Sequence, residues 1–287
     1  MSVNNFIPEI WSAALMEPLY KNLVFGNLAN RDYEGEISGQ GDTVKICEIG
    51  DITIGDYVKN STTSIVLQEL TDAQQLLQID RAKNFNFYLD DIDEAQAKIN
   101  IMPKAMERAG YNLKDAVDQT IAQICSTTGG FFGGLNSTEL GSTVTPLSCA
   151  STLVVQAFSW YDRIMNQNNV PTQGRWIIFP PALAQQLRNA QLIMPQAQQN
   201  GVNPDSAAKV GNFYGFDIYI SNNVYGTVSS QYHVIAGHSM GLSFAGQINK
   251  VEAYRPFTGF ADAIKGLYVF GAKVIRPQAI IKGVLSS

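Results

Sequence analysis

Apolar residues near the start of the chain recur every three or four positions, which is the spacing of one face of a helix. This stripe runs from Ile10 to Leu23. Pro8 suits the first turn of such a helix, Pro18 should kink it, and Gly26 should end it. We therefore predict an amphipathic helix, kinked near its middle, at the start of the chain.

From residue 31 to residue 89 the period of the apolar residues changes to two, as Val44 and Ile46 illustrate. Glycines interrupt the early part of this stretch, and the alternation predicts short β-strands. We interpret the stretch as a long β-hairpin that returns to a strand over residues 84–89. A two-stranded ribbon is only marginally stable in water, so it must lie on another surface. Exposed strand edges are often closed by neighbouring copies of the same chain.

The stretch after residue 100 predicts a second, longer amphipathic helix. Pro103 suits its first turn, and apolar residues from Met106 to Ile124 form a stripe at helical spacing. Gly129 and Gly130 should end this helix. Its length is unusual for a globular protein, and we expect it to act as a strut.

The second half of the chain alternates between helix and strand patterns. Helices are predicted to begin at Ser151 and Pro181, with a buried strand over residues 175–179 between them. After Gly266 we expect two apolar strands that are separated by Arg276-Pro277. Other strands are predicted at residues 216–220, 232–236, 242–245 and 250–254, and loops at residues 131–146 and 194–209. This order predicts a small α/β unit within an α+β fold.

The charge of the chain argues against a protein that reads nucleic-acid sequence. The 287 residues include 20 Lys and Arg against 25 Asp and Glu, a formal net charge of −5. The sequence has no block of basic residues of the kind that neutralises phosphates. Any contact with nucleic acid should therefore be weak and non-specific. Charged residues make up 16% of the chain, below the usual share of about a quarter, which suggests that much of the surface faces other protein.

The three cysteines, Cys47, Cys125 and Cys149, do not have the spacing of a zinc or redox motif. We expect them to be reduced and buried. The N-terminus lacks the charged and apolar regions of a secretory signal, and no apolar window is long enough to span a membrane. The sequence therefore predicts no membrane partner.

Acidic residues gather just before the second helix, at Asp90, Asp91, Asp93 and Glu94. They resemble a set of metal ligands, but Asp91 and Glu94 have the spacing of a helix capping box, and negative charge is stabilising at a helix N-terminus. We therefore predict no metal site here. We also expect no cofactor and no catalytic residue in this chain.

The motif that most suggests catalysis is the GHSMG of residues 237–241, which has the G-x-S-x-G pattern of the α/β-hydrolase nucleophile elbow. That fold needs a helix after the serine and a histidine later in the chain. Here a strand pattern follows, and both His233 and His238 precede Ser239. His233 lies in an apolar strand, where we expect a structural role. A serine hydrolase that uses Ser239 therefore stays a remote alternative.

Five stretches, taken in their order along the chain, resemble the major capsid proteins of tailed bacteriophages with the Hong Kong 97-type fold. They are FIPEIWSAALMEPLYKNLVFGNLANRDY, GDTVKICEIGDITIGDY, LTDAQQLLQIDRAKNFNFYLDDIDEAQA, GFDIYISNNV and FADAIKGLYVFGAKVIRPQAI. No single stretch is a functional signature. The specificity of the resemblance comes from the ordered set, which covers nearly the whole chain.

The resemblance implies a domain layout that agrees with the apolar patterns. Residues 1–30 would form an N-terminal arm, and residues 31–83 an extended β loop that reaches over a neighbouring subunit. Residues 84–147 and 256–287 would form a peripheral domain with a long spine helix, and residues 148–255 an axial α/β domain.

The resemblance also implies a non-enzymatic function. Copies of the chain would form hexamers and pentamers of an icosahedral virion capsid around double-stranded DNA, assembled in the host cytoplasm with scaffolding and portal proteins. Some members of the family cross-link their subunits through a lysine of the extended loop, where this chain has Lys59; we expect Lys59 to be a solvated lysine. The chain starts almost at its first helix, so we expect a separate scaffold or a segment already removed. The alternative is the related shell protein of a cellular nanocompartment, which packages enzymes.

Overall fold

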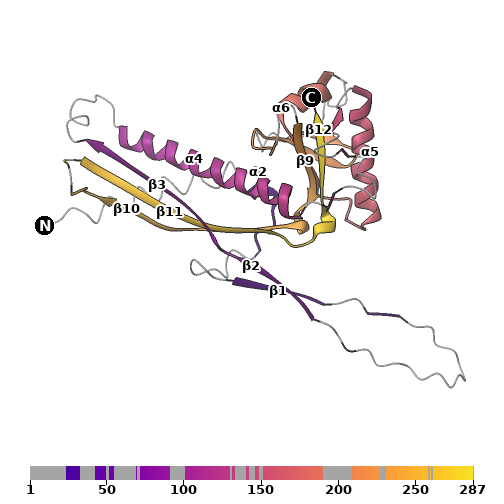
Figure 1. Cartoon of the computed structure of the whole chain (residues 1–287), viewed down its shortest axis with the longest axis horizontal. Helices are drawn as coiled ribbons and strands as arrows, with labels where there is room; N and C mark the ends of the chain where they lie inside the picture. The colour runs from indigo at the N-terminus through magenta and orange to yellow at the C-terminus, as the bar shows by residue number, and fades with distance from the viewer. Residues whose placement is uncertain are drawn as a thin grey trace, which may run out of the picture.

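The computed structural model shows an α+β fold built from two sheets, a long helix and a projecting ribbon (Figure 1). It describes residues 24–32, 43–49, 52–54, 69, 72–90, 101–129, 131–132, 140–141, 146–148, 151–189, 209–226, 231–257, 259 and 261–286. The predicted fold class is therefore confirmed. The helix expected over the first 23 residues, the acidic residues after Asp90 and most of the two expected loops lie outside the described residues.

A three-stranded antiparallel sheet forms the elongated half of the molecule, with strand order β10-β11-β3. Its strands are β3 (Arg81–Asp90), β10 (Leu242–Tyr254) and β11 (Ala261–Val274). Helix α4 (Ile101–Ile124) runs along one face of this sheet (Figure 1). The Phe85 ring lies directly over Gly266 on the neighbouring strand, where any side chain would collide with it.

Helix α4 covers the sheet with the apolar stripe that the sequence predicts. At its start Met102 and Met106 pack against Ile264, and further along Val117 and Ile121 join the cluster that contains Phe244 and Phe270. The helix begins two residues before Pro103, which still lies in the first turn, where a missing N–H leaves no helical hydrogen bond unmade. It continues into a π-helical turn, η3 (Cys125–Gly129), so the expected end at the glycine pair is close to the observed one.

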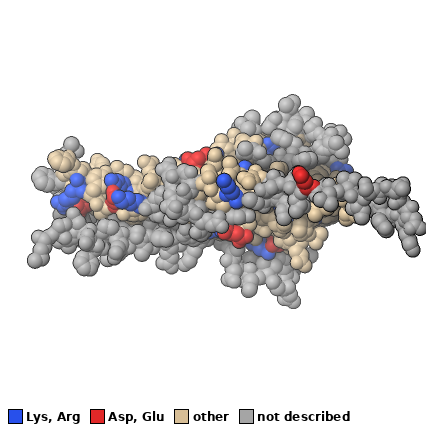
Figure 2. Space-filling model, turned by 90° about the horizontal axis from the view of Figure 1, so that it is seen from below, with Lys and Arg blue, Asp and Glu red and all other residues tan. Residues whose placement is uncertain are grey.

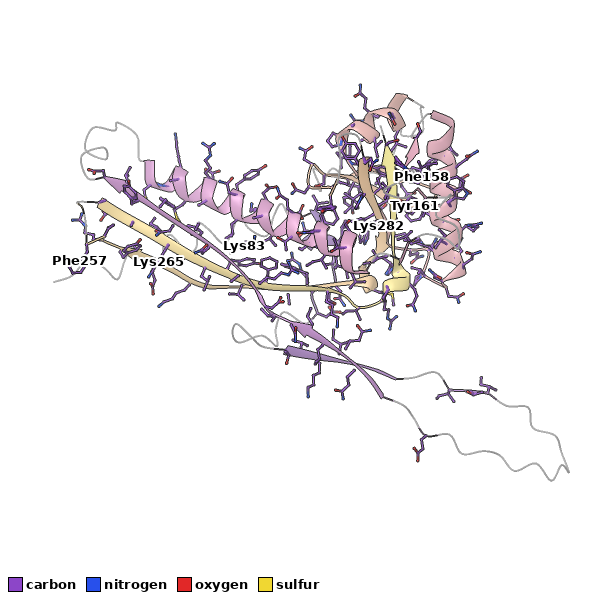
Figure 3. The ribbon with its side chains drawn as sticks, in the orientation of Figure 1. Lys83, Phe158, Tyr161, Phe257, Lys265 and Lys282 are labelled. Carbon is purple, nitrogen blue, oxygen red and sulfur yellow. The ribbon has the colours of Figure 1, made fainter. Side chains whose placement is uncertain are left out.

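A seven-stranded mixed sheet forms the compact half of the molecule. Its strand order is β4 (Phe131–Phe132), β12 (Ile280–Ser286), β9 (Gln231–His238), β6 (Arg175–Phe179), β8 (Phe216–Ile220) and β7 (Lys209–Phe213), with β5 (Leu147–Ser148) paired to β12. Helices α5 (Ser151–Gln167) and α6 (Pro181–Asn189) pack on one face of it. Phe158 and Tyr161 of α5 point into that core (Figure 3). The opposite face meets the end of α4 through Ile178, Ile235 and Ile280.

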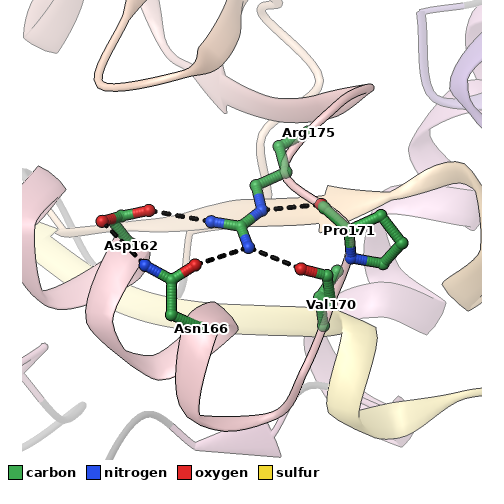
Figure 4. A network of polar contacts seen from close by, with 5 residues as sticks. All are labelled: Asp162, Asn166, Val170, Pro171 and Arg175. Atoms are coloured by element: carbon green, nitrogen blue, oxygen red, sulfur yellow. Dashed lines mark hydrogen bonds and ion pairs between the residues drawn. The ribbon is translucent and has the colours of Figure 1, made fainter.

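A buried arginine fixes the connection between α5 and β6 (Figure 4). The Arg175 guanidinium donates to Asp162 Oδ1 at 2.8 Å and to Asn166 Oδ1 at 2.7 Å, both on α5. It also donates to the carbonyl oxygens of Val170 and Pro171, at 2.6 and 2.9 Å. A buried charge is stable only when it is paired and hydrogen-bonded, and this network meets both conditions.

The two sheets are joined by two short helical turns that lie side by side. Strand β9 leads through η5 (Ser239–Gly241) into β10, and β11 leads through η6 (Pro277–Ala279) into β12. Gly241 packs against Ile280, so the two turns are in close contact. Strand β10 pairs with β11, which pairs with β3, whereas β12 pairs with β9.

The predicted hairpin is confirmed in its described part. Strands β1 (Thr43–Ile49) and β2 (Asp72–Gln78) pair along their full lengths and form a ribbon that leaves the sheet on the side opposite α4 (Figure 1). Leu77 at its base packs against Val269 of β11. Gly271 allows this close approach, since a side chain there would meet the carbonyl oxygen of Gln78.

Two local expectations are wrong. Gly26 does not end a helix but lies inside α2 (Val24–Leu28), where it is buried. The strands expected at residues 242–245 and 250–254 are one strand, β10, which is interrupted by a bulge between Ile248 and Lys250. A bulge shifts the alternation of side chains by one position, and this shift looks like a break in the sequence.

Candidate functional site

The GHSMG motif does not form a nucleophile elbow. Ser239 starts the short turn η5, which leads directly into strand β10 rather than into a helix. Both ring nitrogens of His238 are engaged by backbone groups: Nε2 lies 2.9 Å from the carbonyl oxygen of Gln173, and Nδ1 accepts the N–H of Met240 at 3.2 Å. His238 is therefore a structural residue of the turn and does not serve as a base for Ser239.

A serine–histidine contact occurs elsewhere, between Ser126 Oγ and His233 Nδ1. Both side chains are buried, so no substrate reaches this pair. Burial, with a smaller contribution from the Lys282 charge, lowers the pKa of His233 to about 4. The expected structural role of His233 agrees with its place in the core, although its Nε2 has no hydrogen-bond partner in the described part of the chain.

The four most exposed large apolar side chains of the described residues lie at the extremities of the molecule. On the ribbon, Ile52 and Ile54 are 65% and 93% exposed. Phe257 is fully exposed at the turn between β10 and β11, at the end of the three-stranded sheet furthest from the compact half (Figure 3). Tyr88, near the end of β3, is 72% exposed. Apolar groups in such positions are typical of surfaces that are covered by another protein.

The open face of the three-stranded sheet carries a polar network. Lys265 pairs with Glu252 at 2.9 Å, and Lys250 also contacts Glu252. Tyr254 Oη and the Asn86 amide exchange hydrogen bonds of 3.0 and 3.1 Å. Hydrogen bonds from the two lysines lower the pKa of Glu252. Seen from this side, basic and acidic groups of the described residues are interspersed and form no single basic patch (Figure 2).

A buried carboxylate joins three parts of the chain at the middle of α4. Asp118 Oδ1 accepts the N–H of Phe25 in α2 at 2.9 Å, and Oδ2 accepts Nδ2 of Asn223 at 3.1 Å. Burial raises the pKa of Asp118 to about 6, against the effect of these hydrogen bonds. The sequence gives no signal for this contact, because its partners are 93 and 105 residues away.

A cavity of about 410 Å³ lies beside this carboxylate. Lys83 of β3 lines it on one side (Figure 3). The other lining residues come from α4 and from the segment after β8: Ala116, Gln119, Thr120, Gln123, Asn222, Asn223, Val224, Tyr225 and Gly226. None of the residues that the sequence singled out as chemically interesting lies in this cavity.

The remaining candidate residues are either buried or outside the described part of the chain. Cys125 is a buried free cysteine, and burial together with the Asp118 charge raises the pKa of its thiol to about 12, so it is unreactive. Lys59, Cys149 and the acidic residues after Asp90 lie outside the described residues. Among the described helices, none is long and apolar enough to cross a membrane.

Comparison with known proteins gives one consistent result. A sequence model described as phage capsid protein matches residues 72–283. A solved structure from Mycobacterium phage Che8 is 30% identical to this chain, with a TM-score of 0.69 over 99% of this chain and 98% of that one. The capsid of cyanophage P-SCSP1u is 16% identical, with a TM-score of 0.65 over 93% and 88%.

A virus-like particle from Pyrococcus furiosus shares the fold as well. It is 16% identical to this chain, with a TM-score of 0.57 over 98% of this chain and 100% of that one. No curated protein matches the chain significantly.

Proposed function

This chain belongs to the phage capsid protein family, and from that premise we propose that its copies form hexamers and pentamers that tile an icosahedral shell around double-stranded DNA. As a member of this family the chain is a structural subunit that associates with itself. The arrangement in hexamers and pentamers and the enclosure of DNA are what we propose in addition.

The observation that carries the proposal is the projecting ribbon. Its base is fixed within the subunit: Gln75 Nε2 donates to the carbonyl oxygen of Ile275 at 3.0 Å, and Lys273 Nζ donates to that of Leu76 at 2.9 Å. Further out, Ile52 and Ile54 are exposed. A ribbon with a fixed base and apolar residues in water is stabilised when a neighbouring subunit covers it.

Phe257 and Tyr88 supply a second surface of the same kind at the far end of the three-stranded sheet. Because the ribbon and this end lie well apart (Figure 1), one subunit contacts different neighbours through them. Two unlike contacts on one subunit permit a surface to extend, whereas a single self-complementary contact would stop at a dimer.

We assign the domains by sheet. The three-stranded sheet with α4 forms the peripheral domain, and the seven-stranded sheet with α5 and α6 forms the axial domain. This places β10 in the peripheral domain and β12 in the axial domain, which modifies the division expected from the sequence. Residues 1–30 and 31–83 remain the proposed N-terminal arm and extended loop.

The charge of the subunit supports only weak contact with the packaged DNA. The chain has five more acidic than basic residues, and the charges of its described open face are mixed (Figure 2). A strongly basic lining would retain DNA through the release of counterions. We further propose that the subunit has no catalytic activity, that scaffolding and portal proteins take part in its assembly, and that assembly takes place in the host cytoplasm.

The shell of a cellular nanocompartment is the second candidate. It is favoured by the likeness to the Pyrococcus furiosus virus-like particle, which spans both chains nearly completely. The Che8 structure is nonetheless both more similar in sequence and closer in shape. The contents of purified particles separate the candidates, since a phage shell holds DNA and a nanocompartment holds a cargo protein.

Electron microscopy of the purified protein, combined with size-exclusion chromatography, tests the proposal. We expect closed shells, or rings of five and six subunits. A monomer in every salt condition that still fails to assemble when expressed with candidate scaffolding proteins would contradict the proposal.

A further inference from the structure

Three buried polar side chains join the end of α4 to the seven-stranded sheet. Ser126, in the π-helical turn that follows α4, contacts His233 Nδ1 through its hydroxyl. Lys282 of β12 donates its ammonium to the backbone carbonyl oxygen of the same serine at 2.7 Å. His233 lies on β9, next to β12 in the sheet. One turn of helix is therefore held from two adjacent strands.

The cluster occupies the junction between the two halves of the molecule. The side chain of Lys282 projects from β12 toward the end of α4. It lies on the side of the sheet away from Phe158 and Tyr161 (Figure 3). All three residues of the cluster are less than 10% exposed. Buried polar groups of this kind stabilise a junction only while each keeps its partner.

The cluster tolerates only a neutral imidazole. His233 Nε2 is buried and has no hydrogen-bond partner among the described residues. A protonated ring would carry a charge next to the Lys282 ammonium in a site shielded from water. Desolvation and the like charge both oppose protonation in the closed junction.

The other groups around the ring do not offset this effect. The Tyr225 ring lies 5.3 Å from the His233 ring, and its carbonyl oxygen accepts the backbone N–H of His233 at 2.8 Å. Cys125, beside Ser126, has a neutral thiol. Among the described residues, the charge that acts on the ring is that of Lys282, and it is repulsive.

We propose that Ser126, His233 and Lys282 form an acid-sensitive lock, which holds the end of α4 on the seven-stranded sheet while His233 is neutral and releases it when His233 takes up a proton. The lock belongs to the single subunit, so it does not depend on how subunits assemble.

The sign of the effect follows from the pKa of His233, which burial lowers from its ordinary 6.5 to about 4. Above pH 6.5 the ring is neutral in both the closed and the open junction, and the lock is fully effective. As the pH falls from 6.5 to 4 only the open junction binds a proton. Relative to neutral pH, opening is favoured by about 30-fold at pH 5 and about 150-fold at pH 4.

Hydrogen exchange measured by mass spectrometry tests the lock in the full-length protein. We compare the wild type with His233→Gln, which retains a polar side chain but does not ionise, at matched pH values, so that the intrinsic pH dependence of exchange cancels. At pH 7 the two proteins should exchange alike. At pH 5 peptides from Cys125–Gly129 and Ile280–Ser286 should exchange at least ten times faster in the wild type.

The second histidine provides the control. His238→Gln removes the other imidazole of the chain and should leave the acid response of these peptides unchanged. Equal exchange of wild type and His233→Gln at pH 5 would overturn the proposal, and so would an acceleration that is equally large in α5. Titration of the wild-type ring signals by NMR needs no substitution: a His233 ring that protonates near pH 6.5 would also overturn it.

Discussion

The two sheets of this subunit differ in how their faces are covered. The seven-stranded sheet is buried on both sides, by α5 and α6 on one face and by the end of α4 on the other. The three-stranded sheet has α4 on one face, while Tyr88, Lys265 and Glu252 project from the other. Among the described residues, the compact half is thus covered within one chain. The elongated half presents a face that only the base of the ribbon covers, an apolar end and the ribbon itself.

This difference separates two sources of stability. In the compact half, burial of apolar groups and the Arg175 network act within the subunit. In the elongated half, part of the apolar surface remains in water until another copy covers it. We therefore expect substitutions in the first region to change folding, and substitutions at the extremities to change assembly while leaving folding intact.

Deletion of residues 50–61 from the ribbon should have the largest effect. We expect a subunit with unchanged circular dichroism and unfolding midpoint that forms no shells visible by electron microscopy. Ile54→Asp should act in the same direction, because it places a charge where a neighbour would bury an apolar side chain. Ile54→Val serves as the matched control and should assemble. Normal shells from the deletion variant would refute the role of the ribbon.

Arg175→Met should destabilise the compact half by about 3 kcal/mol. It removes the guanidinium donor from one oxygen each of Asp162 and Asn166 and from two backbone carbonyl oxygens. Urea-induced unfolding of the full-length chain measures this loss. Arg188→Met removes an exposed arginine from α6 and should change the free energy of unfolding by less than about 0.5 kcal/mol. Similar free energies of unfolding for the two variants would mean that the Arg175 network contributes little to stability.

Global unfolding of the subunit should show two opposed pH dependences. Because burial raises the pKa of Asp118 from 3.8 to about 6, the folded state binds the extra proton, and stability falls as the pH rises through this range. His233 has a lowered pKa and acts in the opposite direction, with stability falling as the pH drops from 6.5 to 4. The two contributions therefore oppose each other in the wild type.

Single substitutions should reveal each slope. Asp118→Asn should leave a protein whose unfolding free energy decreases by about 2–3 kcal/mol on acidification from pH 6.5 to 4, from the His233 effect alone. His233→Gln should instead be more stable at pH 4 than at pH 6. Chemical unfolding at several pH values measures both. If the free energy of unfolding changed with pH in the same direction in both variants, the opposite effects assigned to Asp118 and His233 would be wrong.

Glu252→Gln should have the smallest effect. The Glu252 side chain is partly exposed, and its pairs with the more exposed Lys250 and Lys265 are screened by solvent. We expect the thermal unfolding midpoint to stay within experimental error of the wild type. A clear decrease in the unfolding midpoint would show that the open face of the three-stranded sheet contributes to the stability of the single subunit.

The sequence predicts local elements well where a single signal defines them. Helix α6 starts at Pro181 as expected, since proline favours the first turn, and α5 starts at Ser151. The alternation of apolar and polar residues predicts strands β1, β8 and β9. It fails at β10, because the bulge between Ile248 and Lys250 interrupts the period within one strand.

Contacts between distant parts of the chain leave no such local signal. The sequence marked His233 as structural but did not indicate its partners Ser126 and Lys282, which lie on other elements. The same holds for Asp118 with Phe25 and Asn223. Ser239 shows the reverse case: its G-x-S-x-G motif is clear in the sequence, but the structure does not have the turn that this motif requires. The turn leads into strand β10 and not into a helix.

The central claim is that the elongated half is completed by neighbouring subunits, and hydrogen exchange in assembled shells compared with unassembled subunits tests it most directly. The account predicts slower exchange on assembly in the ribbon (Thr43–Ile49, Asp72–Gln78) and at the turn around Phe257, with little change in Arg175–Phe179 and in the buried part of α5. Protection that appears mainly in the compact half, with the ribbon unchanged, would contradict it.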